Sequence, residues 1–405
     1  MKYDFETMLN RFDVGSTKWE EMRSYGITPE MNIMPMSNAE MEFYNLPEVQ
    51  QGLCEYINST VLAYFRPKQS YFDAFIHWNL ERNGWKVEQD WIVPYPGVDG
   101  ILCCTLGSFS REGDGVMLLT PTWPGFFHVI EAHGCHRVDS HLIHKENTYY
   151  IDFEDLEKKA AMPENRFLFF CSPGNPVGRV WTEEELRRVA EICLKHDVMI
   201  ISDEIHSDLV MPGHRHIPMA SLSEEIAQHT ITCMAPSKTF NLAGLFCSNT
   251  IIPNREWRDA FNKTRAKYGI FRPNMLAMKA CELAYEKGGP WLDACIKKLD
   301  ENRRLVETFI AEKLQMLQVT KLEATYLMWV DMRGLGLSTE ELERALMNDA
   351  HVFFDDGYYF GTEGAGFERI NIACPTEAVQ TALERLYDWI SKLKQADPAV
   401  NTASA

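Results

Sequence analysis

The chain has 405 residues, of which 45% are hydrophobic and 24% charged, a composition typical of globular proteins with a large buried core. Its formal net charge is −18 and it contains no Lys/Arg-rich run, which argues against a nucleic-acid partner. There is no run of about 18 apolar residues, so no membrane span is predicted. The first ten residues lack the apolar core of a signal peptide.

The number and spacing of the cysteines indicate the redox state of the compartment in which the protein works. Eleven cysteines are present, and none forms a C-x-x-C pair. Adjacent Cys103 and Cys104 suit neither a disulfide nor a zinc site, and Cys171, Cys233 and Cys247 lie in apolar runs where cysteine behaves as a small hydrophobe. The sequence therefore predicts reduced thiols, a cytoplasmic location and no metal site.

The chain begins with a segment rich in breakers. Gly15, Gly26, Pro29 and Pro35 interrupt any regular pattern in residues 1–45. We expect these residues to form an irregular N-terminal arm that packs with a small C-terminal domain.

Residues 46–288 are expected to form a large α/β domain. Their short apolar runs are continuous, as in strands buried on both faces, and they alternate with helical patterns. Such alternation implies a mainly parallel sheet. The strand candidates are residues 91–95, 116–120, 167–172, 198–202, 230–234 and 248–253.

Residues 182–197 are the clearest helix of this domain, because Thr182 can cap it and Glu185 follows at the capping-box position. Beyond residue 288 the pattern changes to a smaller α+β unit, expected over residues 289–395. Its candidates are helices at 291–316, 338–349 and 377–393 and strands at 327–331, 351–355 and 368–373. Residues 396–405 are expected to be a disordered tail.

Polar or Gly-rich clusters follow four of the predicted strands. "PGVDG" follows 91–95, "PGNPVG" follows 167–172, "DEIHSDL" follows 198–202 and "APSKTFN" follows 230–234. Each cluster alone has an ordinary explanation: a helix start, a turn, a solvated acidic pair or a helix cap. Because ligands of doubly wound sheets sit at the carboxyl ends of strands, the four together predict a binding site at one edge.

These motifs carry a family resemblance. "NPVGRVWTEEEL", "SDEIHSDLV", "SKTFNLAGL" and "RINIACP", with "GSTKWE" and "RPKQSYFDAFIHW", resemble fold-type I pyridoxal-phosphate enzymes of the class I/II aminotransferase superfamily. Within that superfamily the chain looks like the cystathionine β-lyase and cysteine C–S lyase branch, over residues 11 to about 390. The resemblance implies a mostly parallel seven-stranded sheet between helices, a smaller α+β domain and pyridoxal 5′-phosphate as cofactor.

The resemblance also implies roles around the cofactor ring. Lys238 would hold the cofactor aldehyde and later act as a base, which requires a depressed pKa. Asp203 would keep the ring nitrogen protonated, and Asn175 would bind the ring 3′ oxygen. His206 would occupy a position that holds tyrosine in many aminotransferases. Trp123 would stack on the ring where the lyase branch usually has tyrosine.

The cofactor phosphate is expected at the start of a helix. Gly97, Val98 and Asp99 would supply backbone N–H groups there, and Ser237 would add a hydroxyl. Tyr64 matches a tyrosine that, in this superfamily, reaches the phosphate of the neighbouring subunit. The resemblance therefore implies a homodimer with shared active sites.

Three residues are expected to bind the amino-acid substrate. Arg369, in "FERINIACP", matches the arginine that grips the substrate carboxylate, a task for which the planar guanidinium is suited. Ala39 and Asn175 complete the predicted substrate set.

Three departures from the lyase branch bear on the substrate, and a fourth difference, from the aminotransferases, supports the branch. Trp123 replaces tyrosine, and Gly174 replaces a histidine, which would enlarge or soften that wall. Ser37 and Glu40 stand in the arm for tryptophan and aspartate. Phe246 stands where many aminotransferases have a phosphate-binding arginine, an absence shared with the lyases.

The sequence favours a β-elimination enzyme that cleaves L-cystathionine, L-cysteine or another cysteine S-conjugate to pyruvate, ammonia and a thiol. An aminotransferase remains the first alternative, because the residues named above serve both reactions and Trp123 favours transamination. A cofactor-binding regulatory protein is the second. No helix-turn-helix module or basic arm supports DNA binding.

Overall fold

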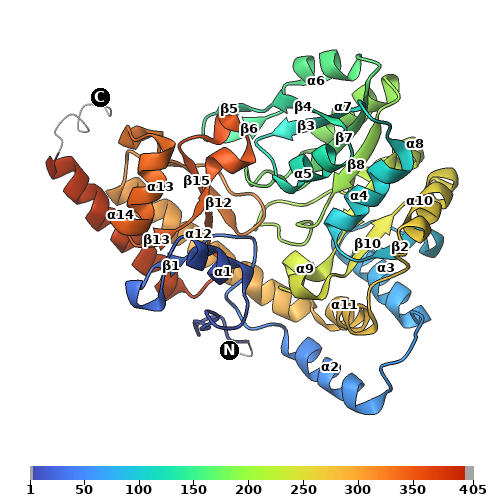
Figure 1. Cartoon of the computed structure of the whole chain (residues 1–405), viewed down its shortest axis with the longest axis horizontal. Helices are drawn as coiled ribbons and strands as arrows, with labels where there is room; N and C mark the ends of the chain where they lie inside the picture. Colours follow the sequence, from blue (N-terminus) through green and yellow to red (C-terminus); the bar gives the residue numbers. More distant parts are fainter. Residues whose placement is uncertain (1–2, 397–405) are drawn as a thin grey trace.

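A seven-stranded sheet forms the centre of the larger part of the chain in the computed structural model, which describes residues 3–396 (Figure 1). In spatial order its strands are β2 (Ile92–Tyr95), β10 (Ser248–Ile251), β9 (Thr230–Met234), β8 (Met199–Asp203), β7 (Asn165–Cys171), β3 (Gly115–Thr120) and β4 (His136–His141). Only β10 runs against its neighbours, so the other six strands end at one edge. The predicted fold class is confirmed.

The middle of the sheet is buried on both faces. In β7, Leu168 and Phe170 join one apolar cluster, whereas Phe167 and Phe169 join another on the opposite face. This double burial explains why the central strands appear in the sequence as unbroken apolar runs. Strand β4 lies at the edge, is largely exposed and has the polar sequence HRVDSH, so the apolar pattern missed it.

Helices cover both faces of this sheet. One face packs against α6 (Phe153–Ala160) and α7 (Glu183–Lys195), and the other against α4 (Val98–Phe109), α5 (Gly125–Ala132) and α10 (Arg255–Lys267). The remaining elements of this part are α2 (Pro47–Ser59), α3 (Gln69–Asn83), α8 (Glu224–Gln228), α9 (Pro236–Thr239), α11 (Met275–Lys287) and the hairpin β5 (Ile143–Lys145) with β6 (Thr148–Tyr150). Among residues 3–396, no helix combines the length and apolarity needed to cross a membrane.

Helix α7 begins as predicted. The backbone N–H of Glu185 donates to the Thr182 hydroxyl at 3.2 Å, and the backbone N–H of Thr182 donates to the Glu185 carboxylate at 2.8 Å. This capping box satisfies two N–H groups that the first helical turn leaves unpaired.

A smaller unit follows the long helix α12 (Gly289–Lys313). It contains a four-stranded antiparallel sheet with the order β11 (Gln318–Val319), β12 (Leu327–Asp331), β15 (Phe367–Asn371) and β14 (Asp355–Asp356), together with α13 (Thr339–Asn348) and α14 (Thr376–Ala396). The strand predicted at 351–355 is wrong as a single element, because β13 (Val352–Phe353) pairs with the arm and β14 pairs with β15. The predicted disordered tail lies, from residue 397 on, outside the described residues.

The N-terminal arm is more regular than predicted. It contains α1 (Thr17–Ser24) and β1 (Met34–Pro35), and β1 pairs in parallel with β13 of the smaller unit (Figure 1). The helix lies between Gly15 and Gly26, which the sequence analysis treated only as breakers. The domain boundaries at residues 45 and 288 stay predictions.

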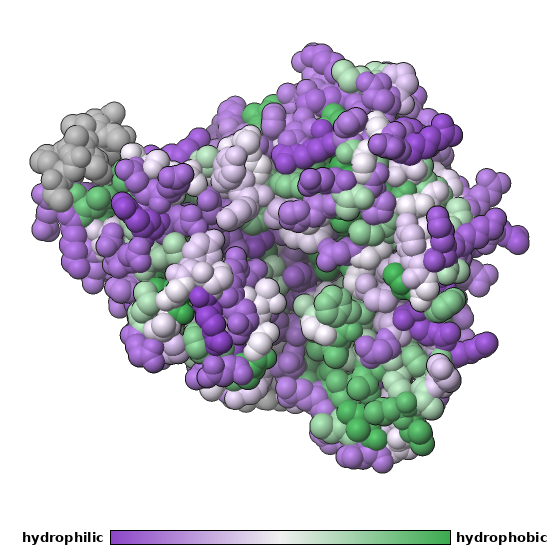
Figure 2. All heavy atoms as spheres, in the orientation of Figure 1, coloured by the Kyte–Doolittle hydropathy of each residue, from purple (hydrophilic) through white to green (hydrophobic). Residues whose placement is uncertain are grey.

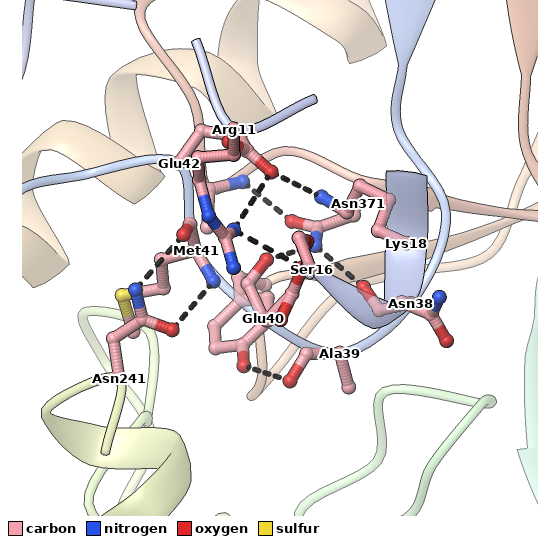
Figure 3. Close-up of polar contacts among 12 residues, drawn as sticks. Arg11, Ser16, Lys18, Asn38, Ala39, Glu40, Met41, Glu42, Asn241 and Asn371 are labelled. Atoms are coloured by element: carbon pink, nitrogen blue, oxygen red, sulfur yellow. Dashed lines mark hydrogen bonds and ion pairs between the residues drawn. The ribbon is translucent and has the colours of Figure 1, made fainter. Parts of the chain in front are cut away.

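A buried ion pair fastens the arm. Nζ of Lys18 lies 2.7 Å from the Glu42 carboxylate, and both side chains are only 1% exposed (Figure 3). Breaking this pair leaves Glu42 with only the longer contact to Arg11, at 3.3 Å, in a site with little water. The pair joins two parts of the arm, and the backbone N–H of Glu42 donates to the backbone oxygen of Ala373 at 2.8 Å, which ties this part of the arm to the smaller unit.

Replacing Lys18 by methionine is expected to lower the free energy of unfolding by about 3 kcal/mol, because Glu42 loses its buried partner. Urea unfolding followed by tryptophan fluorescence measures the change. Lys86→Met is the matched control, since that side chain is 77% exposed and pairs with Glu88 at the surface. The control should shift stability by less than about 0.5 kcal/mol. Equal effects of the two substitutions would contradict a structural role for the buried pair.

Candidate active site

The carboxyl ends of the parallel strands open into a cavity of about 510 Å³. It lies between the large sheet and the arm, where the surface is hollowed (Figure 2). Ten of the predicted site residues line it, and nine of them lie at the end of β2, β3, β7, β8 or β9 or in the loop or helix that follows. They are Ala39, Gly97, Val98, Asp99, Trp123, Asn175, Asp203, His206, Ser237 and Lys238.

Lys238 lies in the short helix α9, directly after β9. Its Nζ donates a 2.8 Å hydrogen bond to the backbone oxygen of Ala39, and that oxygen also accepts from the Tyr326 hydroxyl at 2.9 Å. Burial and the nearby Arg369 lower the pKa of Lys238 to about 8, although the carboxylates around it act in the opposite direction. The amine therefore loses its proton near neutral pH, as a nucleophile or base requires.

Asp203 closes β8 at the floor of the cavity. Burial raises its pKa to about 7, against a 3.2 Å hydrogen bond that its carboxylate accepts from the backbone N–H of Ile205. A cation beside this carboxylate would lower the pKa again. The adjacent Glu204 instead accepts hydrogen bonds from Ser202 and the backbone of Met219 and contacts His216 at 2.9 Å, so it supports the loop.

His206 is a buried, neutral member of the cavity wall. Burial lowers its pKa well below the usual value, and the charges of Lys238 and Arg369 act in the same direction. Its ring packs edge-on against Tyr326 with 6.2 Å between the ring centroids. An uncharged imidazole can bind a polar ring without competing with Asp203 for a cation.

The start of helix α4 faces the cavity and suits an anion. Gly97 caps the helix with φ of 77°, a left-handed conformation that glycine adopts without strain. No side chain caps the helix, so the first backbone N–H groups, at Val98 and Asp99, are available to a ligand. Ser237 also lines the cavity.

Arg369 reaches the site from the smaller unit. On β15 it lies opposite Asp355 of β14, whose carboxylate accepts from its Nε at 3.0 Å and its Nη2 at 2.8 Å. Its Nη1 donates to the side-chain oxygen of Asn175 at 3.0 Å. These contacts orient the guanidinium beside the cavity and leave the Asn175 amide N–H groups free of protein partners within residues 3–396.

The structure places some of the predicted residues away from this cavity. Tyr64 is fully exposed and lines a different surface hollow, so its predicted contact with a second subunit stays a prediction. Neither Ser37 nor Gly174 is among the described residues that line this cavity, and Arg369 lies beside the lining rather than in it, so their predicted effects on the substrate stay predictions. A side chain at residue 174 would meet Val177 at 2.9 Å and Trp181 at 3.6 Å.

Four residues around the site escaped the sequence analysis: Arg11, Asn241, Tyr326 and Asp355. Arg11 and Asn241 line the cavity, while the other two hold Ala39 and Arg369 in place. Each acts through a partner far away in the chain, so no local pattern marks it. The one signal in the sequence that could have indicated Asp355 was the pairing of its strand with the strand of Arg369. Using it required the correct register between β14 and β15.

The cavity fits pyridoxal phosphate by the chemistry of its groups. A buried amine of lowered pKa matches the aldehyde, and a buried carboxylate that lacks a cation matches the ring nitrogen. An uncapped helix start matches the phosphate. The three groups come from β9, β8 and β2, as the sequence predicted.

Comparisons with known proteins agree with this chemistry. The family model described as aminotransferase class I and II matches residues 44–386. Cystathionine β-lyase PatB of Bacillus subtilis is 38% identical, over 95% of this chain and 98% of its own length. Protein MalY of Escherichia coli is 30% identical, over 97% of this chain and 100% of its own length.

A solved structure extends the similarity to three dimensions. Cystalysin from Treponema denticola, whose crystal contains pyridoxal 5′-phosphate, superposes with a TM-score of 0.95 at 42% identity and covers 97% of this chain and 100% of its own. The match of the family model over most of the chain, together with these relatives, shows that the chain belongs to the aminotransferase class I and II family.

Proposed function

We propose that this protein is a pyridoxal-phosphate-dependent C–S β-lyase that acts on cysteine S-conjugates, with L-cystathionine and L-cysteine as candidate substrates. The reaction consumes one water and yields a thiol, pyruvate and ammonia. The observation that carries the proposal is the buried amine of Lys238, poised by the Ala39 carbonyl beside Arg369. The lyases among the relatives favour elimination over transamination.

The cofactor-binding roles are proposed for residues that the cavity brings together. Lys238 would anchor the aldehyde, Asp203 would pair with the ring nitrogen, and the amide N–H of Asn175 would donate to the ring oxygen. His206 and Trp123 would contact the ring. The phosphate would lie against the backbone of Gly97, Val98 and Asp99 and the Ser237 hydroxyl, with Tyr64 added by a second subunit.

Pyridoxal phosphate, when bound, withdraws electrons from the α-carbon of an amino acid. Lys238 would then remove the α-proton, since its lowered pKa makes a much larger fraction of the amine neutral near physiological pH than in an ordinary lysine. The same ammonium can return a proton to the departing thiolate. Breaking the bond from the β-carbon to sulfur leaves 2-aminoacrylate, whose hydrolysis gives pyruvate and ammonia.

Arg369 would bind the substrate carboxylate. Asp355 and Asn175 hold its guanidinium in a fixed plane, so little side-chain freedom is lost when the carboxylate binds. This fixed contact would orient the α-carbon toward Lys238, which is the geometric requirement for proton removal.

A second subunit is proposed to complete the site. An apolar patch covers the region of α2 and the segment that follows it (Figure 2). Val61, Leu62, Tyr64 and Phe271 are exposed there. Exposed apolar patches of this kind mark protein interfaces. Because a C₂ dimer presents the same patch twice, burying it would bring Tyr64 of each chain toward the other.

The cysteines support the further proposal of a cytoplasmic location. All eleven lie within residues 3–396, and all are unpaired. Free thiols in this number are typical of proteins kept in a reducing compartment.

An aminotransferase is the second candidate, favoured by Trp123 in the cavity wall. Purified holoenzyme with L-cystathionine and no keto acid separates the two. Sustained release of pyruvate and thiol is expected, because Lys238 and Arg369 serve elimination without a second substrate. A single stoichiometric conversion of the cofactor that stalls until a keto acid is added would show transamination instead.

Lys238→Ala should lower kcat by about 10³-fold or more, because the base is lost. Thermal unfolding and circular dichroism should show a folded chain. Lys86→Ala, at an exposed lysine, is the control and should keep wild-type turnover. Near-normal rates in Lys238→Ala would remove this residue from the mechanism.

The pH dependence of cofactor capture tests the lowered pKa directly. Only the neutral amine attacks an aldehyde, so the rate at which the cofactor-free protein captures pyridoxal phosphate should rise about tenfold per pH unit below pH 8 and level off above it. Stopped-flow absorbance gives the rate. N-acetyl-lysine amide is the reference, since an ordinary amine with pKa near 10.5 keeps accelerating through pH 9. A protein rate that still climbs at pH 10 contradicts the assignment.

Mixing two inactive variants tests the shared site. Tyr64→Ala and Lys238→Ala, denatured and refolded together, should regain about a quarter of wild-type activity, because half of the dimers are mixed and each mixed dimer has one intact site. Each variant refolded alone is the control. No recovery in a mixture that light scattering shows to be dimeric would place Tyr64 outside the partner's site.

A further inference from the structure

The arm contributes an ion pair to the cavity wall. Arg11 and Glu40 both line the cavity, and Nη1 of Arg11 lies 3.1 Å from Oε1 of Glu40 (Figure 3). Their side chains are 23% and 20% exposed, so both are reachable from the cavity yet largely shielded from bulk water. None of the cofactor-binding or proton-transfer roles proposed above uses them.

Both side chains have unused hydrogen-bonding capacity. Nη1 makes both of the ionic contacts of Arg11, to Glu40 and to Glu42, and within residues 3–396 neither Nε nor Nη2 has a partner. Oε1 of Glu40 accepts from Arg11 and from the Ser16 hydroxyl, while Oε2 has no partner in the same part of the chain. A guanidinium edge and a carboxylate oxygen are therefore available to a ligand.

Neighbouring charged residues of the arm hold the Arg11–Glu40 pair in place. Arg11 lies 3.3 Å from Glu42, whose charge is balanced by Lys18 in the fully buried pair that fastens the arm. Burial raises the pKa of Glu40, but the hydrogen bond from Arg11 and the charge of Lys18 outweigh it, so its pKa lies below the usual value. Glu40 remains a carboxylate, and both charges are fixed before any ligand binds.

The pair lies on the arm side of the reacting amine. Glu40 follows Ala39, whose carbonyl oxygen holds Nζ of Lys238, and the charge of Glu40 is felt at that amine. In the proposed function, Arg369 holds the substrate carboxylate and Lys238 faces the α-carbon. The sulfur substituent then extends toward a different part of the cavity wall. The part of the wall that the arm forms offers this substituent one positive group, Arg11, and one negative group, Glu40.

We propose that Arg11 and Glu40 form a subsite for the far end of the sulfur substituent, selecting substrates whose leaving thiol carries a carboxylate and an ammonium group. This assignment rests on the proposed lyase function. Arg11 would bind the distal carboxylate through its free edge, and Glu40 would bind the distal ammonium through Oε2. An uncharged substituent would leave the ion pair undisturbed and gain neither contact.

Substrates with single distal charges separate the two roles. The holoenzyme would be assayed with S-(2-carboxyethyl)-L-cysteine, S-(2-aminoethyl)-L-cysteine and uncharged S-ethyl-L-cysteine. Arg11→Gln should lower kcat/KM for the carboxyethyl substrate about tenfold more than for the ethyl substrate, chiefly through KM. Glu40→Gln should do the same for the aminoethyl substrate, and L-cystathionine should respond to both substitutions.

Arg23→Gln is the matched control, because this arginine lies on α1 of the same arm, pairs with Asp13 at 3.2 Å and does not line the cavity. Arg11→Lys keeps the charge but loses the planar edge, so it reports on the carboxylate contact if Arg11→Gln fails to fold. Equal losses on all three substrates would overturn the proposal and leave the pair a structural role.

The lyase proposal can fail separately. If the wild-type protein releases no thiol from L-cystathionine, from L-cysteine or from any of the three analogues, lyase activity alone is overturned. Dissociation constants from cofactor absorbance titrations still decide the subsite, because binding of the carboxyethyl compound should weaken selectively in Arg11→Gln. Unchanged relative affinities in both variants would overturn the subsite even if the protein is a lyase.

Discussion

The site depends on the burial of one amine among protein groups. Lys238 is partly buried at the edge where the parallel strands end, and this burial disfavours its ammonium form. A single backbone carbonyl, that of Ala39, holds Nζ in place. The sheet fixes the position of Lys238 just beyond the end of β9, and the arm supplies the acceptor. Neither element alone would provide both burial and orientation.

The arm is therefore part of the catalytic structure rather than an appendage. Asn241, three residues after Lys238, exchanges two 2.9 Å hydrogen bonds with the backbone of Met41 (Figure 3). On the other side Asn371 donates to the backbone oxygens of Asn38 and Glu40 at 2.6 and 2.7 Å. Strand β15 carries both Asn371 and Arg369, so the arm links the loop that carries Lys238 to the strand that carries Arg369.

The parts that could be predicted share one physical cause. Strands buried on both faces must be apolar throughout, and polar residues directly after them must lie at one edge, so Asn175, Asp203 and Lys238 were accessible from local pattern. Edge strand β4 and helix α1 lack that signature, because one is polar and the other lies between two glycines. Tyr326 and Asp355 act only through contacts set by tertiary packing, which no local pattern encodes.

The cavity therefore contains two kinds of residue, those at the strand ends of the large sheet and those of the arm. Those that would face the cofactor, such as Asp203 and Lys238, lie at or just after strand ends, where the sheet fixes their backbone. The arm meets Lys238 through a backbone carbonyl, which any side chain at residue 39 can offer. Arg11 and Glu40 can therefore change without moving the acceptor of Lys238, provided that the buried pair of Lys18 and Glu42 keeps the arm in place. Substrate choice can thus be altered on the arm while the cofactor machinery on the sheet stays intact.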